Sequence, residues 1–201
     1  GCDHFLFTTD KLIRSYNGQN NTIMGVHQIN KNWLNLDAID SILSEEKKLE
    51  LSTEASASIE KCRAYLDKKL QQHDKPIYGI NTGFGSLCNT PVSNNDLEEL
   101  QRNLVMSHAC GIGETVSDDV VQLMLLFKIQ GLSYGHSGVQ LKTVQRLIDM
   151  YNSKVYPVVY ELGSRGASGD FAPLAQLALP LIGVGEVRYE GKTFSSAEIN
   201  A

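Results

Sequence analysis

The chain has 201 residues, of which 42% are hydrophobic and 20% are charged, and its formal net charge at pH 7 is −5. This composition is typical of a globular protein that can bury a substantial core. The negative charge is accompanied by no basic block or arginine-rich stripe, which argues against nucleic acid or an anionic membrane as the main partner.

The first residues are polar and show no hydrophobic periodicity, so we expect residues 1–25 to be poorly ordered and residues 26–201 to form the folded domain. The longest apolar run, residues 172–187, is interrupted by polar residues and is shorter than the ~20 residues of a membrane span. The four cysteines are far apart in sequence and form no C-x-x-C pair. This spacing favours free thiols in a reducing, cytoplasmic setting over a disulfide framework, and it gives no support for a zinc site.

Apolar residues recur every three or four positions along much of the chain, which predicts a mainly α-helical fold. Helices are expected from Ser52 to about Gln72, from a Ser93–Asp96 cap to Gly111, from Ser117 to about Leu132, and from Ser137 or Gly138 through Tyr151. The segment VYPVVYE predicts a short extended piece, and alternation on both sides of Glu190-Gly191 predicts a β-hairpin. The long loops between these elements are rich in glycine and asparagine and are expected to carry the function.

One of these loops, GSRGASGDFAPLAQLALP at residues 163–180, leads directly into an apolar helix. It is not a nucleophile elbow around Ser168, because G-x-S-x-G requires a glycine where the chain has Asp170. Local rules allow a plain helix N-terminus, with Ser168 or Gly169 as the cap, Asp170 in the first turn and Pro173 early in the helix.

The tripeptide Ala167-Ser168-Gly169 also allows a chemical interpretation. The glycine amide nitrogen can attack the carbonyl carbon two residues back and close a five-membered ring, because Gly169 and Gly166 impose little steric cost on a tight bend. Loss of water from Ser168 then leaves an exocyclic methylidene, which is a strong electrophile made from the backbone. The adjoining helix N-terminus would stabilise negative charge that builds up on this ring.

Three blocks of this sequence resemble the aromatic amino-acid ammonia-lyases that use a 4-methylidene-imidazol-5-one group. The blocks are GASGD followed by APLA, YGINTGFG upstream of it, and LQRNLVMSHACGIGE between them. The likeness runs from about residue 32 to residue 201 and covers only the N-terminal part of such an enzyme. It implies the N-terminal part of the aspartase/fumarase-like α-helical lyase fold, with long active-site loops and a small β-hairpin, whose central helices and C-terminal part are absent from this chain.

The resemblance also implies roles for individual residues. Ala167, Ser168 and Gly169 would form the electrophile, and Tyr78 matches the family's catalytic tyrosine on a loop over the site, where a phenol can remove the substrate's β-proton. His108 matches the position that reads the substrate's ring. Taken alone, Tyr78 could be a half-buried loop aromatic, and His108 a core or helix-end histidine.

The pair Ser107-His108, preceded by the apolar Met106, resembles histidine lyases, although some tyrosine lyases and aminomutases also carry Ser-His here. Several positions depart from the histidine-lyase pattern. Gln176 stands where His is usual and Phe171 where Leu is usual, and the other departures are Arg165, Tyr134 and His136.

The sequence therefore predicts an ammonia-lyase that converts an aromatic amino acid, with L-histidine to trans-urocanate as the first choice. The resemblance implies a homotetramer, because the family's sites are built from more than one subunit, and a reaction that needs no metal or dissociable cofactor. Two alternatives stay open: a tyrosine or phenylalanine ammonia-lyase or aminomutase, and a truncated, non-catalytic fragment in which the ring never closes.

Overall fold

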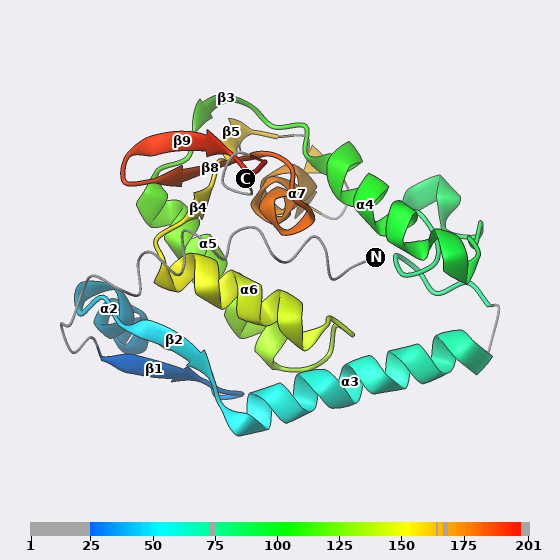
Figure 1. Ribbon diagram of the computed structural model, residues 1–201, viewed down its shortest axis with the longest axis horizontal. Coiled ribbons are helices and arrows are strands. Elements are labelled where there is room, and N and C mark those ends of the chain that lie inside the picture. Colours follow the sequence, from blue (N-terminus) through cyan, green and yellow to red (C-terminus); the bar gives the residue numbers. More distant parts are fainter. Residues whose placement is uncertain (1–24, 73–74, 164, 167–168, 198–201) are drawn as a thin grey trace.

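Figure 1 shows the computed structural model, which describes residues 25–72, 75–163, 165–166 and 169–197. The expectation for residues 1–25 falls almost entirely outside these ranges. The described part is mainly α-helical, as predicted. Its helices are α2 (Leu36–Ser44), α3 (Thr53–Gln72), α4 (Leu97–His108), α5 (Asp118–Ser133), α6 (Leu141–Asn152) and α7 (Phe171–Ala178). Short 3₁₀ turns lie at η2 (Gly85–Leu87), η3 (Asn94–Asp96) and η4 (Leu179–Ile182).

The strands are short and form several small sheets rather than one layer. The parallel pair β1 (Val26–Ile29) and β2 (Lys48–Leu51) is joined through α2. The antiparallel groups are β3 (Ile112–Thr115) with β5 (Tyr160–Leu162), β6 (Arg165–Gly166) with β7 (Gly169–Asp170), and β4 (Tyr156–Pro157) with β8 (Glu186–Tyr189) and β9 (Lys192–Ser195). The helices supply most of the core, and the short strands add Ile29, Leu49 and Tyr156 to it.

The core lies between α5 and α6, which pack against each other in the middle of the molecule (Figure 1). Their buried apolar side chains are Val121, Leu125, Leu126, Ile129, Leu132, Val144, Leu147, Ile148, Met150 and Tyr151. The long helix α3 runs along one edge and buries only Ala55 and Ile59, close to its N-terminal end. The other apolar residues of its stripe are only half-buried. The helical period seen in the sequence therefore marks a side that faces the rest of the fold without being deeply buried.

The hairpin of β8 and β9 confirms the prediction from the alternating sequence. Its two turn residues, Glu190 and Gly191, both have positive φ, +48° and +73°. A two-residue turn with positive φ at both positions matches the right-handed twist of the flanking strands. VYPVVYE is extended where predicted, although it contributes to two separate strands, β4 and β5.

The boundaries of α4 and α6 differ from the predictions. Helix α6 begins at Leu141, because Gly138 has φ +66° and a Cβ there would come within 2.7 Å of the Leu66 side chain. Helix α4 ends at His108, three residues before the predicted Gly111. The Ser93 hydroxyl bonds the Asp96 carboxylate at 2.7 Å instead of a backbone N–H.

The prediction of a simple cap before the last helix was also wrong in its details. Gly169 is in strand β7, and Asp170 precedes α7 instead of lying in its first turn. The pairing of β6 with β7 holds these residues in extended backbone, so the helix begins only at Phe171. Ser168, the other candidate cap, lies outside the described residues.

Candidate active site

The loop that carries Tyr78 is held by buried polar side chains. Asn81, which is 4% exposed, accepts a hydrogen bond from the Ile77 N–H at 2.7 Å and donates one to the Lys75 carbonyl at 3.2 Å. Thr82 is fully buried, and its hydroxyl accepts from the Gly79 N–H at 3.2 Å. The asparagine and threonine of YGINTGFG therefore shape the turn that displays Tyr78, whose own side chain is 61% exposed.

A side chain of helix α4 also holds this loop by hydrogen bonds to its backbone. The side-chain amide of Gln101 donates to the carbonyls of Gly79 and Ile80, both at 2.9 Å. Gly79 has φ +68°, and a Cβ at this position would lie 2.7 Å from the Phe84 ring. Only glycine fits this combination of positive φ and close packing.

Four aromatic side chains from three separate segments meet next to this loop. The ring centroid of Phe84 lies 5.6 Å from that of Tyr78, 5.3 Å from His108 and 6.1 Å from Phe171. His108 and Phe171 are 5.7 Å apart and nearly perpendicular. These separations are within the favourable range for aromatic pairs. We refer to Tyr78, Phe84, His108 and Phe171 as the ring cluster.

The orientation of the His108 imidazole follows from its backbone contact. Nδ1 lies 2.7 Å from the Leu104 carbonyl oxygen, which can only accept, so Nδ1 carries the proton. The Ser107 hydroxyl also donates to the Leu104 carbonyl, at 3.1 Å, and its oxygen is 3.2 Å from Nδ1. In the neutral ring Nε2 is therefore the acceptor that remains for a ligand. Ser107 therefore shares the Leu104 carbonyl with His108 and lies next to its Nδ1.

The segment around the predicted electrophile is partly described. Arg165 pairs with Asp170 and Gly166 with Gly169 in the antiparallel strands β6 and β7. Ala167 and Ser168 connect the paired glycines in the sequence and lie outside the described residues. Phe171 follows this segment and begins α7, so the ring cluster adjoins the predicted electrophile along the chain.

Gln176 has a structural role that the sequence did not reveal. It is 4% exposed, and its side-chain oxygen accepts a hydrogen bond from the Tyr160 N–H at 3.0 Å. Its amide also packs on Gly111, where a Cβ would lie only 2.5 Å from the Gln176 nitrogen. Gln176 therefore joins α7 to β5 and to the chain that follows α4. The sequence showed Gln176 only as a polar residue within an apolar helix and as a departure from the histidine-lyase pattern.

The departures at Tyr134 and His136 lie elsewhere in the fold. Both are in the connection between α5 and α6, which packs on α3 closely enough that a Cβ on Gly135 would come within 2.7 Å of the Ser58 backbone. His136 is exposed, and the contacts that define the ring cluster involve neither residue.

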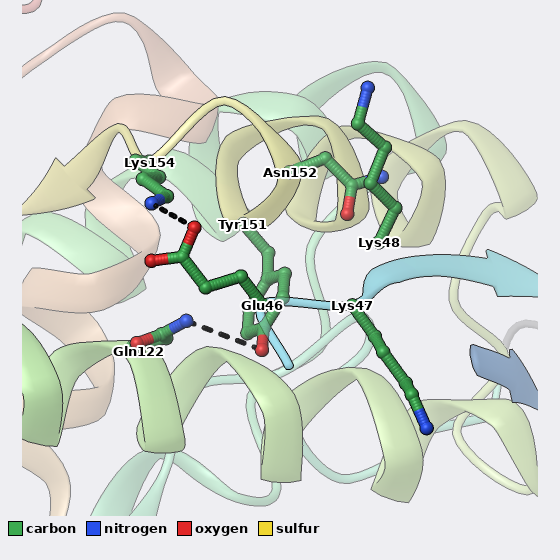
Figure 2. Close-up of a pocket in the computed structure, with 7 residues that line it drawn as sticks. All are labelled: Glu46, Lys47, Lys48, Gln122, Tyr151, Asn152 and Lys154. Atoms are coloured by element: carbon green, nitrogen blue, oxygen red, sulfur yellow. Dashed lines mark hydrogen bonds and ion pairs between the residues drawn. The ribbon is translucent and has the colours of Figure 1, made fainter. Parts of the chain in front are cut away.

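A hollow on the surface lies at a different place and shares no residue with the ring cluster (Figure 2). It is lined by Glu46, Lys47, Lys48, Gln122, Tyr151, Asn152 and Lys154. Lys154 pairs with Glu46 at 3.0 Å, and the Gln122 amide donates to the Tyr151 hydroxyl at 3.3 Å. Burial raises the pKa of Tyr151, which keeps its phenol protonated. Four of the lining side chains are already paired with each other, so we take the ring cluster rather than this hollow as the candidate active site.

Two further observations bear on the kind of site. Within the described ranges, no group of three or more His, Cys, Asp or Glu side chains is arranged to hold a metal ion. No helix in the same part of the chain has the length and hydropathy needed to cross a membrane.

Comparison with known proteins identifies the family of the chain. Residues 34–201 match the family model described as aromatic amino acid lyase. The histidine ammonia-lyase of Legionella pneumophila (strain Corby) is 50% identical over 165 residues, which are 82% of this chain and 32% of that protein. The chain thus spans about a third of the length of the curated relatives that it matches.

Solved structures of the same kind share the fold. Histidine ammonia-lyase from Trypanosoma cruzi superposes with a TM-score of 0.74 at 33% identity, covering 86% of this chain and 33% of that one. Tyrosine aminomutase from Streptomyces globisporus gives a TM-score of 0.79 at 30% identity, covering 87% and 32%. These matches confirm the predicted lyase fold. The family model covers the ring cluster and the glycine loop together, and the chain therefore belongs to the aromatic amino acid lyase family.

Proposed function

We propose that the protein to which this chain belongs is an ammonia-lyase that converts L-histidine to trans-urocanate and ammonia. The observation that carries the proposal is the ring cluster, in which Tyr78 and His108 both contact Phe84, and His108 contacts Phe171, the residue that follows the glycine loop. The 50% identical relative is a histidine ammonia-lyase, which supports histidine as the substrate.

The residues around Ala167, Ser168 and Gly169 fit a 4-methylidene-imidazol-5-one group. Gly166 and Gly169, which precede and follow Ala167-Ser168 in the chain, are antiparallel register partners, and neither residue carries a Cβ that would crowd the ring. Helix α7 begins two residues after Gly169, which places its positive end next to the segment. Once formed, the group supplies an electron-poor centre that activates the substrate for loss of ammonia.

The other residues of the site act on the substrate directly. We assign to the exposed Tyr78 phenol the removal of the β-proton, because its loop is anchored by Asn81 and Gln101 and its ring rests on Phe84. His108 would orient the substrate's side chain through Nε2, since its Nδ1–H is bonded to Leu104. Both assignments rest on the resemblance and on this geometry.

Intact mass and turnover of the full-length enzyme test the electrophile. Ring closure and serine dehydration each remove one water, so each subunit should be lighter than its sequence mass by two water molecules. Ser168→Ala should abolish the dehydration and the turnover, whereas the exposed control Ser137→Ala should keep both losses and full activity. An active enzyme with the unmodified sequence mass would refute the proposed chemistry.

A tyrosine lyase or aminomutase is the second candidate, and the fold comparison favours it in one respect. The tyrosine aminomutase structure superposes with a TM-score of 0.79, against 0.74 for the histidine ammonia-lyase structure. Comparing kcat/KM on histidine and tyrosine separates the two, because histidine should be preferred if the first proposal is correct. Exchanging Met106-Ser107-His108 should then shift the preference.

A homotetramer and a cytoplasmic location remain predictions. Ile112 and Leu162 are register partners on the β3–β5 pair and are 68% and 60% exposed, so this pair presents apolar surface that further contacts could cover. Sedimentation of the full-length protein would measure its oligomeric state.

A further inference from the structure

Phe84 and Phe171 enclose His108 in a defined way. Their two rings are almost parallel, with 10° between the planes, and the imidazole stands at 80° to one and 75° to the other. The three centroids form a nearly equilateral triangle, with sides of 5.3, 5.7 and 6.1 Å. The histidine thus makes a perpendicular contact with each of two stacked phenyl rings, which is a preferred aromatic arrangement.

The His108 imidazole is held at Nδ1 and by two neighbouring rings, and none of these contacts uses Nε2. Nδ1 is bonded to the Leu104 carbonyl, which anchors one edge of the ring to helix α4. A ring held at a single nitrogen can still rotate about its side-chain bonds, because the terminal torsion of histidine is broad. Phe84 and Phe171 contact the imidazole from two other segments and restrict that rotation.

The two phenylalanines are themselves fixed from different directions. Phe84 packs against Gly79 and contacts Tyr78, so its position follows the Tyr78 loop. Phe171 is the first residue of α7, a helix that packs against α4 and is joined to β5 through Gln176. The ring of Phe171 is 42% exposed, so packing of the core alone does not account for its position.

We propose that Phe171 is a positioning residue for His108: together with Phe84 it holds the imidazole so that Nε2 faces the bound amino acid, and it thereby sets the affinity for the substrate's side chain. The proposal rests on the function assigned to His108 above. It predicts that the aromatic ring of Phe171 matters, rather than its apolar character. Leucine at this position would keep the apolar contact and lose the perpendicular ring contact.

Kinetics of the full-length enzyme provide the first test. Phe171→Leu should raise KM for histidine about three- to tenfold, the range expected from the loss of the aromatic pair with His108, while kcat changes less than about twofold. The matched control is Phe127→Leu, an identical substitution at a 51% exposed phenylalanine on α5, and its KM should stay unchanged. Phe84→Leu should also raise KM, which provides a second variant if Phe171→Leu fails to fold.

A double-mutant cycle separates positioning from a general structural effect. In a His108→Ala background, Phe171→Leu should have no further effect on KM, because the side chain that it positions is gone. Additive effects of the two substitutions, or a response of Phe171→Leu equal to that of Phe127→Leu, would overturn the proposal.

Acylation of His108 by diethyl pyrocarbonate gives a readout that does not require turnover. Peptide mass spectrometry should show faster acylation of His108 in Phe171→Leu than in Phe127→Leu, with the exposed His136 as an internal reference whose rate is unchanged. An unchanged His108 rate overturns the positioning role. Failure of the unmodified enzyme to convert histidine would refute the proposed function instead, and the acylation rates would then decide on Phe171 alone.

Discussion

Replacing Gly79 with alanine should displace the Tyr78 loop, and the structure allows the cost to be divided into two parts. Gly79 has φ +68°, where an alanine is strained by about 1–2 kcal/mol. Its new Cβ would also lie 2.7 Å from the Phe84 ring, and crowding of this kind typically costs about 1–3 kcal/mol. The local free energy of opening should therefore fall by about 2–5 kcal/mol.

Gly85 provides a matched control on the same loop. Its φ is +59°, but a Cβ there would meet nothing within 4 Å, so Gly85→Ala should carry only the backbone strain of about 1–2 kcal/mol. Hydrogen exchange of the full-length protein, followed in peptides that cover residues 77–92, measures both changes, since the Asn81 and Val92 amides are bonded within this loop. Activity should fall further in Gly79→Ala, because Phe84 contacts both Tyr78 and His108. Equal loss of protection in the two variants would show that contact with Phe84 does not hold the loop.

Two further predictions concern stability. Gln176→Leu should lower the free energy of unfolding, measured by urea denaturation, by about 1–3 kcal/mol, because the Tyr160 N–H loses its buried partner. The control Gln145→Leu, at an exposed glutamine, should change this free energy little. Equal effects of the two substitutions would contradict the role of Gln176. Burial, and secondarily the charge of Lys47, lowers the pKa of His27 below its ordinary value of 6.5. The unfolded chain therefore binds more protons between the lowered pKa and 6.5, so stability should rise with pH across this window. His27→Gln should flatten that rise, and an unchanged pH profile of the denaturation midpoint would contradict it.

Much of the fold could be predicted from local patterns. The periodic apolar residues of α3, α5 and α6 identify these helices because each stripe faces the rest of the fold, fully buried on α5 and α6 and half-buried along most of α3. The Glu190-Gly191 turn identifies the hairpin. The parallel pair of β1 and β2 was not predicted, because each strand has only four residues and its partner is about 20 residues away. Strand β3 was missed as well, since all four of its residues are exposed and show no alternation.

Part of the candidate site could likewise be predicted from the sequence, and part could not. The tripeptide at 167–169 could be singled out because its chemistry lies in three consecutive residues, and the resemblance then pointed to Tyr78 and His108. No sequence pattern pointed to Phe84, and Phe171 stood out only as a departure from the family pattern. Their contacts join residues up to 87 positions apart, from Phe84 to Phe171, and no local pattern in the sequence encodes such a contact.

By itself the sequence determined helices α3 to α7, the hairpin turn and the backbone atoms that could form an electrophile, because these properties depend on neighbouring residues, whereas the nine-residue helix α2 was not predicted. Only the tertiary structure decided that Phe84 contacts Tyr78, His108 and Phe171, and that Gln176 ties α7 to β5. The physical reason is that ring contacts and buried hydrogen bonds between distant segments form only when the elements that carry them pack together, as α7 does with α4 and β5.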